Sequence, residues 1–214
     1  MGREPLPPAP RVTLLRRIGD YAAHPDPLTA ACNRIALIVA WNQPFYPLYL
    51  WWLVGGDWWV SVWTFLSTPF FAGVPIVARR NALAGRALLP LTGIANALLS
   101  TKAFGQASGV ELFLIPCMLI ALLAFRRSEQ RVAVALSGAT AIAVWAHGHY
   151  GAPLGRFDAS QYADFQRLNA TSVAALSAVI LWSLIRARTS SARQGSRSTP
   201  PCLSARCPST DPQK

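Results

Sequence analysis

Six long apolar runs constrain the fold of this chain more than any other feature of its sequence. Each run is about 17 to 22 residues long, and a helix needs roughly 20 mostly apolar residues to cross the hydrocarbon core of a bilayer. As helices, the runs would be about 25–33 Å long, close to the thickness of that core. The sequence therefore predicts an all-α fold, a polytopic integral membrane protein with a six-transmembrane-helix bundle. The runs cover approximately residues 34–54, 57–78, 83–101, 109–125, 132–149 and 168–185.

The composition agrees with a membrane protein. Hydrophobic residues make up 52% of the chain and charged residues 14%, against roughly 25% charged residues in soluble domains. These values exclude a chain that is disordered throughout and argue against a soluble enzyme. The net charge of +11 would indicate a nucleic-acid partner in a soluble protein. Cytoplasmic loops of membrane proteins collect Lys and Arg, however, so we expect the lipid bilayer, and no nucleic acid, as the partner.

The distribution of basic residues predicts the orientation. With the N-terminus in the cytoplasm, 17 of the 20 Lys and Arg residues fall on the cytoplasmic side, and only Lys102, Arg156 and Arg167 fall outside. Six spans then place both termini in the cytoplasm. The basic cluster near the N-terminus is followed by polar residues 24–27 and not by the apolar core of a signal peptide. Short-looped spans without a cleavable signal favour a multi-pass protein of the plasma membrane, specifically the bacterial inner membrane.

The chain divides into three regions by composition. Residues 1–33 form a cytoplasmic N-terminal segment. Within it, residues 11–23 place apolar side chains at helical spacing, and arginines flank that apolar stripe. That pattern predicts an amphipathic helix on the membrane surface. A basic segment that stays in water ahead of the first span is the alternative, since it would have the same composition. Residues 34–186 form the six-helix transmembrane domain. Residues 187–214 are basic and rich in Ser and Pro, which predicts a disordered cytoplasmic tail.

Polar residues and prolines interrupt the first three runs near the expected midplane of the membrane. Asn42 follows Arg34 by about 12 Å of helix, and Pro44 and Pro47 should kink the helix there. Polar groups in a membrane face the bundle interior or a cavity. They could line a ligand pocket between the first three spans, built at broken helices as in transporters, or only join helices by hydrogen bonds. The candidate ligand-binding residues are Asn42, Gln43, Ser67, Thr68 and Asn96.

Glu111, near the start of the fourth run, is a further candidate ligand-binding residue. A carboxylate within a membrane-spanning segment marks a functional site by default. Ser108 and Glu111 also have the S-x-x-E spacing of a capping box, in which Glu111 would bond to the first amides of its helix. The box would place Glu111 at the outer interface, close enough in sequence to pair with Lys102. Both interpretations remain open.

Two histidines, His147 and His149, close the fifth run and are candidate metal ligands. Imidazole binds zinc and copper, but a spacing of two residues does not put both side chains on one helical face. The chain has no HExxH, G-x-S-x-G or P-loop motif. We therefore expect no catalytic residues and no cofactor.

The fifth run is rich in small side chains. Such residues allow close helix contact in membranes, either within one bundle or between two copies of a chain. Self-association through this run is therefore a second expected interaction. The small residues are Ala133, Ala135, Ser137, Gly138, Ala139, Ala141 and Ala143.

The segment AFGQASGVELFL, residues 103–114, carries a family resemblance. It resembles a stretch in the six-span N-terminal membrane modules of bacterial nucleotide cyclases and histidine kinases, where an aromatic-Gly turn and a Gly-hydrophobic start lead into an apolar helix. The six-span layout with both ends inside agrees with the resemblance. Those proteins continue into a catalytic domain, whereas this chain ends in a polar tail. The resemblance thus implies a free-standing membrane module, with an output supplied by a separate signalling partner or with no output.

These observations favour a non-enzymatic membrane module that senses or binds a small, apolar or weakly polar ligand. A small-solute transporter or channel is the first alternative, because transporters use the same broken helices. An intramembrane enzyme or metal-binding protein that uses His147, His149 and Glu111 is the second. Solute uptake by reconstituted vesicles would identify a transporter, and bound metal that is lost in His147→Ala would identify a metal protein.

Overall fold

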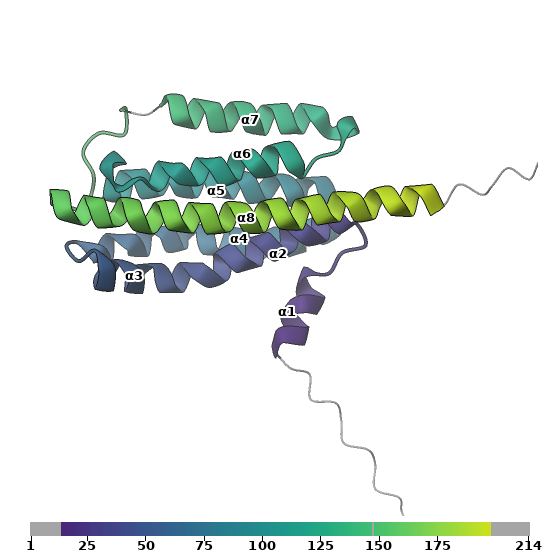
Figure 1. The fold of residues 1–214 in the computed structure, drawn as a ribbon, viewed down its shortest axis with the longest axis horizontal. Helices are drawn as coiled ribbons and strands as arrows, with labels where there is room; N and C mark the ends of the chain where they lie inside the picture. Colours follow the sequence, from purple (N-terminus) through teal and green to yellow (C-terminus); the bar gives the residue numbers. More distant parts are fainter. Residues whose placement is uncertain (1–13, 147, 198–214) are drawn as a thin grey trace, which may run out of the picture.

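The computed structural model describes residues 14–146 and 148–197, and every regular element in these two ranges is helical. The long helices lie side by side along one axis (Figure 1). The α-helices are α1 (Leu14–Ala22), α2 (Pro27–Asn42), α3 (Tyr46–Leu53), α4 (Thr68–Arg80), α5 (Ala82–Phe104), α6 (Leu114–Leu123), α7 (Gln130–Trp145) and α8 (Ala159–Arg197). The 3-10 segments are η1 (Gln43–Phe45), η2 (Trp58–Ser67), η3 (Gln106–Ser108), η4 (Val110–Phe113) and η5 (Arg127–Glu129).

Among the residues that the structure describes, three helical segments are long and apolar enough to cross a membrane. They are Trp58–Arg80, which joins η2 to α4, Ala82–Phe104, which is α5, and Ala159–Ser191 within α8. A shorter apolar helix covers Val110–Leu123. The predicted all-α fold is confirmed, and the chain has the helices of a membrane protein.

The first apolar run is a broken helix. α2 ends at Asn42, the 3-10 segment η1 follows, and α3 begins at Tyr46. Pro44 lies inside η1 and has no N–H to donate, so the α-helical hydrogen-bond pattern cannot continue through it. The break predicted from the prolines is therefore present, as a switch from α-helix to 3-10 helix.

A glycine turn joins α3 to η2 in an antiparallel pair, as the short interval between the first two runs predicts. Gly55 and Gly56 have φ angles of 74° and 62°, which side chains with a Cβ adopt at a cost. A Cβ on Gly56 would also lie 2.9 Å from Oε1 of Gln161 on α8. The positive φ angle favours glycine at both positions, and at Gly56 the close approach of Gln161 adds a second reason.

The main apolar core lies where α2, α4, α5, α6 and α8 meet, and it includes Ile35, Phe71, Leu89, Ile120 and Ile180. A second, aromatic cluster at the other end of the bundle includes Phe104 and Phe165, whose ring centroids are 5.3 Å apart. Between the two clusters the helices leave room for polar side chains and a cavity.

α1 runs across the bundle axis beside the end where α2 begins (Figure 1). The hydroxyl of Tyr21 donates to the carbonyl of Ala72 over 2.7 Å, and the Arg79 guanidinium lies 5.1 Å from the Tyr21 ring. Leu14, Leu15 and Ile18 remain exposed. The predicted helix over 11–23 is present over Leu14–Ala22, while residues 11–13 lie outside the described residues.

The last helix is longer than the sequence predicts. α8 continues through Arg197, past position 187, where the polar tail was expected to begin. Residues 198–214 of the predicted tail lie outside the described residues.

Candidate functional site: a cavity inside the bundle

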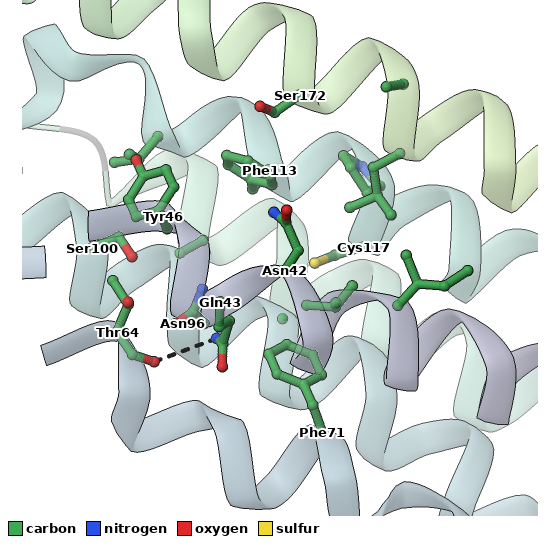
Figure 2. A pocket seen from close by; sticks show the side chains of 18 of the residues that line it. Asn42, Gln43, Tyr46, Thr64, Phe71, Asn96, Ser100, Phe113, Cys117 and Ser172 are labelled. Atoms are coloured by element: carbon green, nitrogen blue, oxygen red, sulfur yellow. Dashed lines mark hydrogen bonds between the residues drawn. The ribbon is translucent and has the colours of Figure 1, made fainter. Parts of the chain in front are cut away.

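A cavity of about 590 Å³ lies between α2, α3, α5, α6 and α8. Its volume falls in the usual range for small-molecule sites. Most of the lining is apolar, as in Figure 2, where Phe71, Phe113 and Cys117 border the space. A few polar side chains converge on it, namely Asn42, Gln43, Tyr46, Thr64, Asn96, Ser100, Thr171 and Ser172.

Asn42 points into this cavity from the last residue of α2 (Figure 2). Within the described residues, its side chain makes no hydrogen bond and no other polar contact. A carboxamide carries two N–H donors and one carbonyl acceptor. Asn42 is exposed, so all of them are available to a molecule in the cavity or at its opening. In an apolar setting an unsatisfied amide costs free energy.

Gln43, the next residue, also borders the cavity, but it is nearly fully buried and its amide is bonded to neighbouring segments. Its Nε2 donates to Ser67 Oγ over 2.6 Å and to the carbonyl of Thr64 over 3.4 Å, the bond drawn in Figure 2. The Thr68 hydroxyl donates to Gln43 Oε1. Gln43 thereby joins the break in the first apolar run to the junction of η2 and α4.

The same network extends to α5 through Asn96. Ser67 Oγ lies 2.8 Å from Oδ1 of Asn96, to which it donates, and it accepts from Gln43. Three apolar segments are thus connected by side-chain hydrogen bonds beside the cavity. Such bonds are worth roughly 0.6 kcal/mol each on average in membrane proteins.

The structure therefore separates the predicted polar residues into two groups. Asn42, Gln43 and Asn96 line the cavity, whereas Ser67 and Thr68 lie behind Gln43 and are outside its lining, as far as the structure describes the chain. The two interpretations of this cluster, a ligand pocket and hydrogen bonds between helices, are compatible, because neighbouring residues have different roles. Gln43 joins helices, and Asn42 faces the space.

The predicted location of the pocket, between the first three apolar runs, is incomplete. α6 contributes Cys117 and Ile120, and α8 contributes Ser172 and Ile180. These walls could not be assigned from local patterns, because they depend on which helices become neighbours in the bundle.

Sequence reasoning also missed a polar contact between α3 and α8. The Tyr46 hydroxyl donates to Oδ1 of Asn169 over 3.0 Å, and Nδ2 of Asn169 donates to the carbonyl of Ser108 over 2.9 Å. Asn169 is fully buried. Asn169 and Ser172, three residues apart at the start of an apolar run, form a polar helical face that could have signalled these positions.

The cavity opens at the side of the bundle. Several of its lining side chains are also exposed on the outer surface of α2, α3 and α8, and all are large and hydrophobic. The opening is therefore rimmed by exposed apolar side chains. These lining residues are Ile38, Tyr49, Trp52, Leu53 and Val179.

Glu111 lies in η4, outside the part of the cavity lining that the structure describes, although Val110 and Phe113 of the same segment are in it. The predicted capping box is wrong. Gly109, with φ of 72°, is the N-cap of η4, and the Ser108 hydroxyl donates instead to the carbonyl of Gly105 over 2.5 Å. The left-handed glycine turns the chain between Ser108 and Glu111, so the box geometry cannot form.

The candidate metal ligands lie at the end of the fifth run. His147 is outside the described residues. His149 stacks on Trp145, with ring centroids 6.1 Å apart. Among the described residues, no group of three or more His, Cys, Asp or Glu side chains is placed to hold a metal ion. A metal site that uses both histidines stays a prediction.

No protein-family model, curated protein or solved structure matches this chain. The class of the protein is therefore defined by its own helices and cavity. In the part that the structure describes, it is a helical protein with three helices able to span a membrane and a mostly apolar cavity, which is bordered by a polar group with unused hydrogen-bonding capacity.

Proposed function

We propose that this chain is a six-span protein of the plasma membrane, of the bacterial inner-membrane type, with both termini in the cytoplasm. Each of the six apolar runs is helical over most of its described residues, and the first is one broken span from Pro27 to Leu53. α7 has 16 residues, or about 24 Å of helix. Arginines from α5 and α8 meet at one end of the bundle, where Arg86 bonds Ala124 and Arg188 bonds Phe125. This clustering supports a cytoplasmic location for that end.

Within this membrane protein, the cavity is a binding site for a small ligand, and the chain works as a non-enzymatic sensing or ligand-binding module. The observation that carries this proposal is the Asn42 carboxamide, which faces the cavity with no partner in the described part of the chain. A ligand that hydrogen-bonds Asn42 would remove the cost of leaving that amide unsatisfied.

The lining specifies the chemistry of the ligand. The mostly apolar wall favours an apolar body, and Asn42 together with Ser100 favours one or two polar groups near its middle or end. The lateral opening beside Trp52 favours a molecule that partitions into the bilayer and enters from there. A weakly polar, membrane-soluble molecule fits these requirements better than an ion.

Small molecules that co-purify with the full chain test the proposal. Ser172→Phe fills the cavity from α8, and Asn42→Leu removes the polar anchor. The matched control is Ala174→Phe, on an exposed face of the same helix outside the cavity lining. Mass spectrometry of extracts should show a small molecule that is present in the wild type and in Ala174→Phe and is depleted in the two cavity variants.

Thermal unfolding in detergent separates loss of ligand from loss of fold. The cavity variants should unfold cooperatively, with ligand loss far larger than any loss of stability. A set of extracts that is the same for all four proteins would count against a ligand site. So would ligand loss that only follows the loss of stability.

The broken helices support a second candidate, a small-solute transporter. The break at η1 and the 3-10 segment η2 both end beside the cavity, and discontinuous helices meet at the substrate site in many transporters. Uptake of a solute by vesicles that contain the chain, and its loss in Ser172→Phe, would favour transport over sensing.

A further inference from the structure

A second hollow, a groove of about 930 Å³, runs between α6, α7 and α8 and shares no lining residue with the cavity. Along α7 its lining extends from Gln130 to Ala141, a rise of about 16 Å. That length is about half of the roughly 30 Å hydrocarbon core of a bilayer. The groove is therefore a site distinct from the cavity assigned above.

One end of the groove is basic. Arg126, Arg127 and Arg188 line it there. Arg127 forms no ion pair in the part of the chain that the structure describes. Arg188 uses Nε and Nη2 to bond the carbonyls of Leu123 and Phe125, over 2.8 and 3.0 Å, so its charge meets no carboxylate.

The carboxylates nearest this end are already engaged. Asp26 accepts from Arg126 over 2.7 Å, and Glu129 is held by Arg86. The positive charge of Arg127 and Arg188 is therefore left for an external anion.

The rest of the groove is apolar and has room. Its walls include Met118, Leu122 and Val134, with Ala141 at the far end. Gly138 lies on its floor, and a Cβ built there would meet nothing within 4 Å. An apolar chain can therefore lie along α7 below the arginines.

We propose that this groove binds an anionic phospholipid, with its phosphate on Arg127 and Arg188 and one acyl chain along α7. Basic pockets between membrane helices are the usual place for acidic lipid headgroups. The inference requires that the chain lies in a membrane, but it does not depend on a ligand in the cavity.

A second copy of the chain fits this groove less well, although its small residues were expected to favour self-association. In a two-fold dimer about the membrane normal, each surface meets its own copy. Arg127 and Arg188 would then face like charges, which disfavours association. An anionic lipid neutralises the same arginines.

Native mass spectrometry of the full chain in a neutral detergent, titrated with phosphatidylglycerol or phosphatidylcholine, tests the proposal. Phosphatidylglycerol should bind at least tenfold more tightly. Arg127→Gln should weaken its binding about fivefold, the effect of removing one arginine near a lipid phosphate. Arg131→Gln is the matched control, since Arg131 is exposed at the start of α7, four residues after Arg127, and lies outside the groove, and it should leave the affinity unchanged.

The acyl chain is tested separately. Gly138→Leu should fill the groove and reduce phosphatidylglycerol binding at least tenfold with all arginines intact. Gly73→Leu, at another helical glycine with nothing within 4 Å, is the control. Cooperative thermal unfolding of each variant ensures that a folded protein is measured.

Four results would overturn the proposal. One is equal binding of the two lipids, and another is an equal loss in Arg127→Gln and Arg131→Gln. Competition by glycerol phosphate as strong as that of the lipid would mean that the site takes a free anion only. A dimer that Gly138→Leu abolishes, without bound lipid in the wild type, would identify a second copy as the occupant.

Discussion

Arg86 on α5 and Glu129 in the turn before α7 form a two-point ion pair. Nη2 of Arg86 lies 2.5 Å from Oε1 of Glu129, and Nη1 lies 2.9 Å from Oε2. Arg86 is only 2% exposed, and its Nη1 also donates to the carbonyl of Ala124 over 2.7 Å. Glu129 in turn accepts from the backbone N–H of Arg126 over 2.8 Å. One carboxylate thus ties α5 to the connection between α6 and α7.

Removing that carboxylate should strongly destabilise the protein. Glu129→Gln leaves the buried Arg86 charge uncompensated, and we expect a loss of about 2–4 kcal/mol in the free energy of unfolding. Thermal or denaturant unfolding in detergent measures it. Asp164→Asn, which breaks the exposed pair with Arg167 at 3.4 Å, should change stability by less than about 0.5 kcal/mol. Equal effects of the two substitutions would contradict this assignment.

The stability of the protein should also depend on pH through Glu129 and Asp26. Burial alone would raise the pKa of Glu129 above its ordinary 4.5, but bonds from Arg86 and Arg126 and the attraction of their charges outweigh burial and lower it. Burial would likewise raise the pKa of Asp26. Hydrogen bonds from Thr29 and the attraction of the Arg126 and Arg86 charges outweigh burial, so the pKa of Asp26 is lowered.

A carboxyl group whose pKa is lower in the folded protein than in the unfolded chain stabilises the fold at pH values above its pKa in the unfolded chain. That contribution is lost as the pH falls through the folded value. The thermal midpoint in detergent should therefore stay level from neutral pH down to about 4.5 and decline below it. In Glu129→Gln the decline should be shallower. A midpoint that fell instead between pH 7 and 6 would point to a different titrating group.

α4 and α5 approach each other closely at Gly85. A Cβ there would lie 2.5 Å from Cβ and 2.6 Å from Cα of Ala78. Because the obstacle includes backbone, Gly85→Ala should cost about 1–3 kcal/mol. Gly73→Ala, in an open position on α4, should raise stability by up to about 1 kcal/mol. Unfolding in detergent compares the two, and an unchanged Gly85→Ala protein would contradict this packing.

Asn42 and Gln43 should respond differently to the loss of their polar groups. Gln43→Leu breaks bonds with Thr64, Ser67 and Thr68 and should cost about 1–2 kcal/mol. Asn42→Leu removes no hydrogen bond in the described part of the chain and should leave stability within about 0.5 kcal/mol. Unfolding of both variants in one detergent tests this. Equal losses would mean that Asn42 is also structural.

Cysteine labelling in cells tests the proposed orientation. In a background with Cys202→Ser and Cys207→Ser, Ala107→Cys should react with a membrane-impermeant maleimide added outside. Arg127→Cys should react only after the membrane is permeabilised. Both positions are exposed and lie at opposite ends of the bundle. The reverse pattern would invert the topology, and the unmodified background controls for the buried Cys32 and Cys117.

Much of the helical layout could be predicted because it depends on local properties of the chain. Run length and apolar content define where helices form, and Gly55 and Gly56 mark the tight turn between the first two runs. Pro44 identifies the break, because a missing N–H acts on the same helix. The polar positions within the apolar runs were also predictable, since Asn42, Gln43 and Asn96 interrupt those runs.

By itself, the sequence determined that this chain is helical, apolar enough for a membrane and polar at one depth. Only the tertiary structure decided that Gln43 joins helices while Asn42 faces a cavity, because the side chains of successive helical residues point about 100° apart and only packing shows which direction is occupied. It also decided that Arg86 pairs with Glu129 and that α8 closes the cavity. These contacts join residues far apart in the chain, and local periodicity carries no information about which helices become neighbours.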